Sequence, residues 1–145
     1  MGIRDGADVD DAGLLHVGPQ SAGADPGPAC YGKGGQQVTV TDANVVLGRL
    51  QPDFALGGSL ALDVPAAEQA MDRLAQALGL TRQQAADWVL PLAHEHMTQA
   101  LRVISIHKGL DPADVPLLTF GCPGRPHVRP LPHHPPTPAA CLPPT

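Results

Sequence analysis

Apolar residues first occur as two short runs near the start of the chain. Residues 7–9 and 14–17 have the pattern of short strands, and the Asp and Gly residues between them suit a tight turn. A third short β segment is predicted at residues 38–40. It follows a stretch over residues 21–37 in which Gly and Pro are dense, which predicts a defined but irregular loop.

Helical spacing of apolar residues then predicts a first helix over residues 43–50, with Val46, Leu47 and Leu50 on one face. Either Thr41 or Asp42 is expected to cap its start, because both side chains can accept a hydrogen bond from the first turn. A connection over residues 51–62 follows, with Pro52 and a Gly pair.

Two longer helices are predicted over residues 65–79 and 81–108. Asp63 is the expected N-cap of the first, and Gly79 suits its C-terminal end. Thr81 and Gln84 have the spacing of a capping box at the start of the second. Because the connection between the two helices is very short, we expect them to pack as an antiparallel pair.

The long helix contains Pro91, which removes one backbone hydrogen bond and predicts a kink or a break there. Its apolar series is expected to continue to about Lys108. The series consists of Ala85, Val89, Leu92, Met97, Ala100 and Ile104.

Residues 115–120 are then predicted to form one buried strand. Residues 122–145 are rich in Pro and have no periodicity, so they are predicted to be a disordered tail.

Together these elements predict an α+β fold: short N-terminal strands, a Gly/Pro loop, three helices, one late strand and a disordered tail. The net charge of −5 argues against a nucleic-acid partner and against an anionic membrane surface. No apolar run approaches the roughly 18 residues of a membrane span. Aromatic residues are only 3% of the chain, so much of the apolar content is Ala, which buries little area.

The three cysteines, Cys30, Cys122 and Cys141, are odd in number and lack CxxC spacing. This pattern favours reduced thiols in the cytoplasm over a disulfide framework or a zinc site. His94 and His96 flank Glu95, but side chains two apart on a helix point in different directions and cannot share a metal. We therefore predict no metal site in the chain.

Residues 27–34 nearly match the phosphate-binding pattern G-x-x-x-x-G-K-[ST]. The last position fails, because Gly34 has no hydroxyl to hold Mg²⁺, and a β segment follows where a helix should begin. We interpret the stretch as a rigid connecting loop. Asp25, Cys30 and Asp42 are the candidates for ligand contact, because each lies in or beside this loop. Turn formation at Asp25 and helix capping at Asp42 are the competing interpretations, and Cys30 has no visible base to activate it.

Two longer motifs carry a resemblance to a known family. The run A-D-P-G-P-A-C-Y-G begins at Ala24, and T-D-A-N begins at Thr41. With their flanking residues, these segments resemble the hydantoinase A/5-oxoprolinase family, and the resemblance extends over about residues 9–121.

The resemblance implies a larger enzyme subunit with an actin-like ATPase fold that uses ATP and Mg²⁺. Members open cyclic amides such as hydantoins and 5-oxoproline, and relatives carboxylate acetone or acetophenone. Phosphorylation of an unreactive oxygen would activate such substrates. The resemblance also implies a partner subunit or domain of hydantoinase B type. By this resemblance Asp25, Gly27, Asp42 and Gly121 are the candidate cofactor-binding residues, while catalytic residues are not identified.

The chain departs from the family pattern at its phosphate-binding segments. The N-terminal phosphate loop and a second glycine-rich segment are absent from this sequence, and after Gly121 a third glycine-rich loop is replaced by a proline-rich stretch. We therefore expect residues 1–121 to be a partial family domain, and residues 122–145 to come from a shifted reading frame.

Two functional hypotheses follow. In the first, the chain is part of an ATP-dependent cyclic-amide hydrolase that is inactive alone and binds no cofactor alone, because preorganised phosphate contacts are missing. In the second, it is a small helical protein-interaction module without catalysis.

Overall fold

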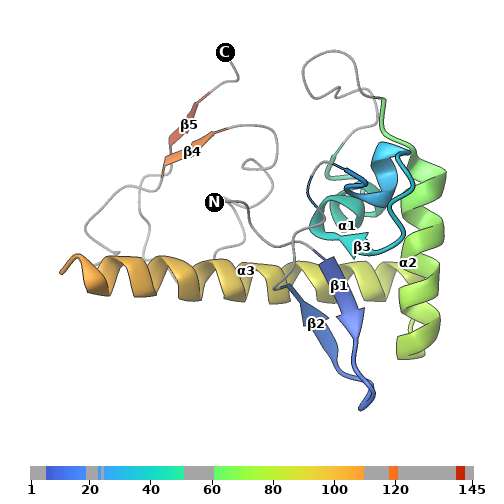
Figure 1. The fold of residues 1–145 in the computed structure, drawn as a ribbon, viewed down its shortest axis with the longest axis horizontal. Coiled ribbons are helices and arrows are strands. Elements are labelled where there is room, and N and C mark those ends of the chain that lie inside the picture. Colours follow the sequence, from blue (N-terminus) through green and yellow to red (C-terminus); the bar gives the residue numbers. More distant parts are fainter. Residues whose placement is uncertain are drawn as a thin grey trace. The chain divides into compact units, whose positions relative to one another are not determined.

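The computed structural model describes residues 6–18, 23, 25–50, 61–109, 118–120 and 140–142, the last two ranges by their backbone alone. The chain forms two compact units, residues 1–93 and residues 94–145. Helix α3 (Arg82–His107) runs from the first unit into the second. Figure 1 shows the helices and strands along the chain.

The first unit contains a small antiparallel sheet. Strand β1 (Gly6–Val9) lies between β2 (Leu15–Val17) and β3 (Val38–Thr39). Ala7 is paired with Val17 on one side and with Val38 on the other, and all three side chains are buried. The two predicted N-terminal strands are confirmed, and the predicted third segment is confirmed over Val38–Thr39.

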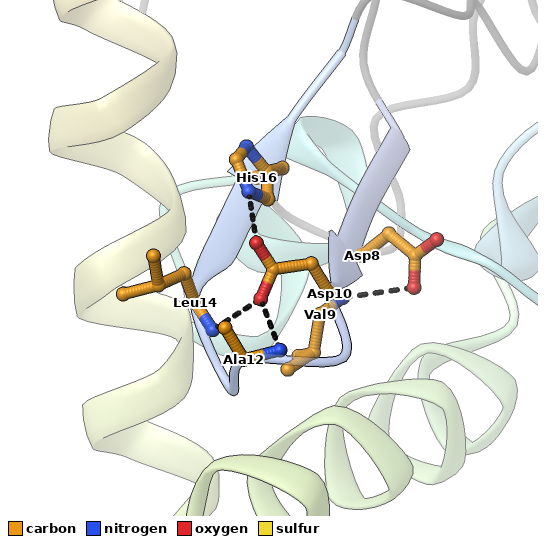
Figure 2. A network of polar contacts seen from close by, with 6 residues as sticks. All are labelled: Asp8, Val9, Asp10, Ala12, Leu14 and His16. Atoms are coloured by element: carbon orange, nitrogen blue, oxygen red, sulfur yellow. Dashed lines mark hydrogen bonds and ion pairs between the residues drawn. The ribbon is translucent and has the colours of Figure 1, made fainter.

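The turn between β1 and β2 is organised by Asp10, as Figure 2 shows. One carboxylate oxygen, Oδ1, accepts hydrogen bonds from the backbone N–H groups of Ala12 and Leu14, both at 2.9 Å. The other, Oδ2, lies 2.8 Å from Nε2 of His16. Gly13 has a φ of 80°, a conformation that favours glycine. The Asp and Gly residues that predicted a turn thus form it directly.

Helix α1 (Val40–Val46) begins and ends earlier than predicted. Its N-cap is Thr39, so the expectation that Thr41 or Asp42 caps the helix is wrong. The Thr39 hydroxyl accepts from the backbone N–H of Asp42, and the Asp42 carboxylate accepts from the backbone N–H of Thr39. Asp42 is therefore the third helical residue of a reciprocal capping box.

Helix α2 (Val64–Leu78) matches the prediction. Asp63 is the N-cap and accepts a hydrogen bond of 3.0 Å from the backbone N–H of Ala66. Gly79 ends the helix in a left-handed conformation with a φ of 67°. The buried face of α2 consists of Ala67, Ala70, Met71, Leu74 and Ala75.

Helix α3 begins after Thr81, whose hydroxyl accepts from the backbone N–H of Gln84, while Oε1 of Gln84 accepts from the backbone N–H of Thr81. The predicted capping box is confirmed. The helix continues through Pro91, so of the predicted kink or break the break is wrong. Pro91 and Asp87 lie on the exposed side, where water can bind the Asp87 carbonyl that lacks its usual partner.

The two halves of the apolar series in α3 differ in how far their side chains are buried. Ala85 and Val89 are fully buried, together with Ala86 and Leu90. Ala100 is exposed, and Ile104 has 51% of its surface exposed. The series predicted as one face is thus buried only at its beginning.

Helices α2 and α3 are not an antiparallel pair. Figure 1 shows the start of α3 crossing α2 steeply. The Arg82 guanidinium contacts two carboxylates of α2, Asp72 at 2.6 Å and Glu68 at 3.0 Å. This half-buried cluster holds the first turn of α3 against the middle of α2. The short connection between the two helices does not by itself determine their crossing angle.

In the second unit, β4 (Leu118–Phe120) pairs in parallel with β5 (Ala140–Leu142). Strand β4 falls within the predicted strand over residues 115–120, of which 115–117 lie outside the described residues. Strand β5 differs from the disordered tail predicted for residues 122–145, because residues 139–142 are an apolar stretch free of Pro. The other tail residues, and residues 51–60 of the predicted connection, lie outside the described residues.

Candidate functional site

Two glycines close the base of the loop that was predicted over residues 21–37. Below, the name Gly/Pro loop refers to its residues 25–35. Gly27 has a φ of 73°. A Cβ atom on Gly35 would lie 2.1 Å from the carbonyl oxygen of Gly27 and 3.1 Å from the carbonyl of Pro28. The two ends of the loop therefore meet backbone against backbone, which only glycine permits at position 35.

The carboxylate of Asp42 holds this loop from inside. Oδ1 accepts a hydrogen bond of 2.8 Å from the backbone N–H of Cys30. Oδ2 accepts from the backbone N–H of Ala29 at 3.3 Å, and from the N–H and hydroxyl of Thr39 at 2.9 and 2.8 Å. Asp42 is 0% exposed, so a buried charge is satisfied by four donors from two separate segments.

Cys30 lies in the short 3₁₀ helix η1 (Ala29–Tyr31) and links the starts of two α-helices. Its N–H bonds to Asp42 in α1, and its carbonyl oxygen accepts a hydrogen bond of 2.7 Å from the backbone N–H of Asp63, the N-cap of α2. Its side chain is fully buried and packs with Val45, Leu62 and Ala67. Cys30 is thus a structural junction.

The Cys30 thiol has a strongly raised pKa. Burial is the largest cause, and the negative charge of the neighbouring Asp42 is the next. A thiol becomes nucleophilic by losing its proton. Cys30 is therefore held in its unreactive form, which weighs against the nucleophilic role considered from the sequence.

The near-match to a phosphate-binding loop at residues 27–34 does not form a phosphate cradle. Such a cradle needs backbone N–H groups that point toward the ligand. Here the N–H groups of Ala29 and Cys30 donate to Asp42. This arrangement supports the interpretation as a rigid connecting loop, and the loop as described does not fit a nucleotide phosphate held by these amides.

The structure places the candidate binding residues at different depths. Asp25 is exposed and Gly27 is buried in the loop, while Asp42 is buried beneath it. The hydrogen bonds of Asp42 connect it with the same loop that carries the other two. Gly121 lies outside the described residues. Of the four candidates, three therefore belong to one connected region of the first unit.

The histidines of α3 behave as the helical spacing predicts. His94 is 5% exposed, whereas His96 and His107 are exposed. The two neighbours of Glu95 thus face different surroundings. Among the residues that the structure describes, no group of three or more His, Cys, Asp or Glu side chains could hold a metal ion.

Asn44 and Gly35 belong to this region but were not among the candidate residues predicted from the sequence. Nδ2 of Asn44 donates to the carbonyl oxygen of Val40 at 2.9 Å, and Oδ1 is buried with no hydrogen-bond partner in the described part of the chain. Asn44 lies in the T-D-A-N motif, so its presence there was the available signal. Gly35 had none, because its approach to Gly27 depends on the path that the loop takes between them.

In the described ranges, every helix is too short or too polar to cross a membrane.

Comparison with known proteins identifies the class. A family profile described as Hydantoinase/oxoprolinase matches residues 7–132, a range that runs past the limit near residue 121 expected from the motifs. The chain belongs to this family.

Three relatives illustrate its range. The chain is 45% identical over 126 residues to caprolactamase subunit alpha of Pseudomonas jessenii, covering 86% of this chain and 18% of that protein. It is 42% identical to the acetophenone carboxylase gamma subunit of Aromatoleum aromaticum, with 86% and 17% covered. It is 36% identical to 5-oxoprolinase of Dictyostelium discoideum, with 80% and 10% covered.

The fold agrees with the sequence. The crystal structure of the ATP-dependent caprolactamase from Pseudomonas jessenii matches with a TM-score of 0.78 and 44% identity, covering 90% of this chain and 19% of that one. The chain thus spans less than a fifth of these relatives.

Proposed function

We propose that this chain is one section of an ATP-dependent enzyme that opens cyclic amides. The observation that carries the proposal is its 45% identity to caprolactamase subunit alpha together with the match to the ATP-dependent caprolactamase structure. In the complete enzyme the section belongs to an actin-like ATPase fold that uses ATP with Mg²⁺ in the cytoplasm. A cyclic amide is the substrate, and a hydantoinase B-type subunit or domain is the partner.

Within this section, Asp25 and Gly27 are the proposed contacts to the nucleotide site, with Gly121 as a third. The position of Asp25 supports this role. Asp25 is exposed at the edge of the loop, and the buried Asp42 carboxylate holds that loop through the N–H of Cys30. Loops held by a rigid scaffold are where ligand contacts are most often placed. The chain's own loop amides do not supply a phosphate cradle, so the remaining contacts come from other sections of the enzyme.

A direct test transplants the section. Residues 7–121 replace the matching segment of caprolactamase subunit alpha, and ATP-dependent hydrolysis of caprolactam is measured. We expect the chimera to keep measurable turnover, and the 145-residue chain alone to show none with caprolactam, hydantoin or 5-oxoproline. A folded chimera without turnover would contradict the proposal, and so would turnover by the chain alone.

The site assignment has a matched pair of variants in the same chimera. Asp25→Asn is expected to lower turnover by about tenfold or more, as loss of a charged contact to a ligand does. Asp11→Asn, which alters another exposed aspartate in the β1–β2 turn, is expected to leave it unchanged. Equal effects of the two substitutions would remove Asp25 from the site.

One observation favours the second hypothesis, a helical interaction module without catalysis. The last turns of α3 expose three large apolar side chains, Val103 at 55%, Ile104 at 51% and Ile106 at 74%. Exposed apolar surface of this kind promotes association. Sedimentation of the chain over a range of concentrations tests this, with Ile106→Glu expected to abolish any association. A strictly monomeric chain would exclude self-association through this surface.

A further inference from the structure

We infer that Asp42 is a positioning residue: its carboxylate takes the place of a bound anion on the loop amides and thereby sets the shape of the Gly/Pro loop. This inference rests on the proposed function only where it names Asp25 and Gly27 as the residues that the loop positions. The dependence of the loop on Asp42 holds whether or not the intact enzyme binds ATP there.

The geometry of the donors carries the inference. The N–H groups of Ala29 and Cys30 converge on the two oxygens of one carboxylate, at 3.3 and 2.8 Å. The Asp42 side chain reaches them from a residue in α1, which is itself fixed by the reciprocal bonds with Thr39. One side chain therefore connects the loop, the end of β3 and the start of α1.

Direct contact between Asp42 and a ligand conflicts with the same geometry. Both carboxylate oxygens are occupied by donors of the chain, and the residue is 0% exposed. A ligand would have to displace buried hydrogen bonds to reach it. Asp42 thus acts on a ligand through the loop that it holds, while Asp25 lies at the exposed edge of that loop.

The hydrogen bonds to Asp42 lie between the two glycines that close the loop. Gly27 and Gly35 touch backbone to backbone, a contact with no side chain to reinforce it. Between these two glycines, the N–H groups of Ala29 and Cys30 join the loop to α1 through the Asp42 carboxylate. Without the carboxylate, two buried N–H groups lose their acceptor, and such groups either rearrange or admit a substitute.

The test uses the full 145-residue chain and a small anion as probe. Asp42→Ala is compared with the parent chain by amide hydrogen exchange, with and without sodium formate at constant ionic strength. We expect exchange at Ala29, Cys30 and Thr39 to become about tenfold faster or more in the variant. Formate, a carboxylate small enough for the vacated position, is expected to restore protection and the melting temperature in part.

The matched control is Asp63→Ala, which removes an N-cap aspartate whose side chain accepts a hydrogen bond from the Ala66 N–H at the start of its own helix. It is expected to lower the melting temperature without any recovery in formate. Should Asp42→Ala fail to fold, Asp42→Asn keeps the side-chain shape and removes the charge, and faster exchange at the same amides is expected.

Unchanged protection of Ala29 and Cys30 in either Asp42 variant would overturn the inference. So would a recovery in formate by the parent chain or by Asp63→Ala as large as the recovery by Asp42→Ala. These outcomes do not involve ATP or caprolactam, so a failure here is distinguishable from a failure of the proposed function.

Discussion

The backbone N–H of Cys30 donates a 2.8 Å hydrogen bond to the carboxylate of Asp42, and burial together with the charge of this carboxylate raises the pKa of the Cys30 thiol. The Asp42 charge thus holds the loop and adds to the effect of burial on the thiol. The thiol lies in the A-D-P-G-P-A-C-Y-G motif, and its side chain packs with Val45, Leu62 and Ala67. Packing and hydrogen bonding therefore account for a cysteine at this position.

Cys30 is predicted to resist alkylation in the folded chain. Because burial and the Asp42 charge disfavour the thiolate, iodoacetamide at pH 8 should modify Cys30 at least tenfold more slowly than in the urea-unfolded chain. Peptide mass spectrometry separates Cys30 from Cys122 and Cys141. Asp42→Asn should accelerate the reaction by removing the charge that raises the pKa. Equal rates in folded and unfolded chains would contradict this account.

Gly35→Ala is predicted to destabilise the first unit by about 1–3 kcal/mol, as overpacking does. The added methyl group would lie 2.1 Å from the Gly27 carbonyl oxygen, and backbone must move to admit it. Urea unfolding measures the loss. Gln37→Ala changes an exposed neighbouring residue and should leave the free energy of unfolding unchanged. An equally stable Gly35→Ala chain would show that the two ends of the loop do not touch.

Pro91→Ala is predicted to stabilise helix α3. The substitution restores an N–H group that can bond to the Asp87 carbonyl one turn earlier, and an interior proline costs up to about 3 kcal/mol. The free energy of unfolding from urea titration should rise. Arg102→Ala, at an exposed helical position, serves as the control with little change expected. A decrease for Pro91→Ala would mean that Pro91 makes favourable contacts that outweigh the missing hydrogen bond.

The β1–β2 turn is predicted to weaken at low pH through Asp10. The Leu14 N–H, then the His16 ring, hold the pKa of Asp10 below its ordinary value of 3.8. The ionised form is therefore favoured by folding, so its contribution is present above that ordinary value and is lost as the pH falls through the lower pKa. In Asp10→Asn, the melting temperature should vary less between about pH 5 and about pH 2.

Asp11→Asn is the control for this pH dependence, because Asp11 is a neighbouring exposed aspartate of the same turn. It should retain the acid sensitivity of the parent chain. Identical pH profiles for Asp10→Asn and the parent would show that the turn does not depend on the Asp10 charge.

Helix termini and the first hairpin were predictable because their signals are local. Asp63 caps α2 three residues before its partner N–H, and Gly79 ends that helix by adopting a left-handed conformation. Thr81 and Gln84 satisfy each other within one turn. In each case the donor and acceptor are neighbours in sequence, so residue type and spacing are sufficient.

The start of helix α1 was predicted too late in the sequence because three neighbouring residues compete as its cap. Thr39, Thr41 and Asp42 can each cap a helix, and the choice of Thr39 is linked to contacts outside the helix. Asp42 is retained inside the first turn because Ala29 and Cys30 need its carboxylate. Helical periodicity contains no information about donors from another segment.

The sequence by itself determined the family, the hairpin, the caps of α2 and α3, and the loop that carries Asp25 and Gly27. Only the tertiary structure decided that Asp42 is buried under that loop, that Gly35 closes it, and that α3 continues through Pro91 and crosses α2. The physical reason is distance along the chain: Asp42 meets its loop donors 12 and 13 residues away. Pairing at such separations depends on how the whole unit packs, whereas caps and turns depend on the nearest few residues.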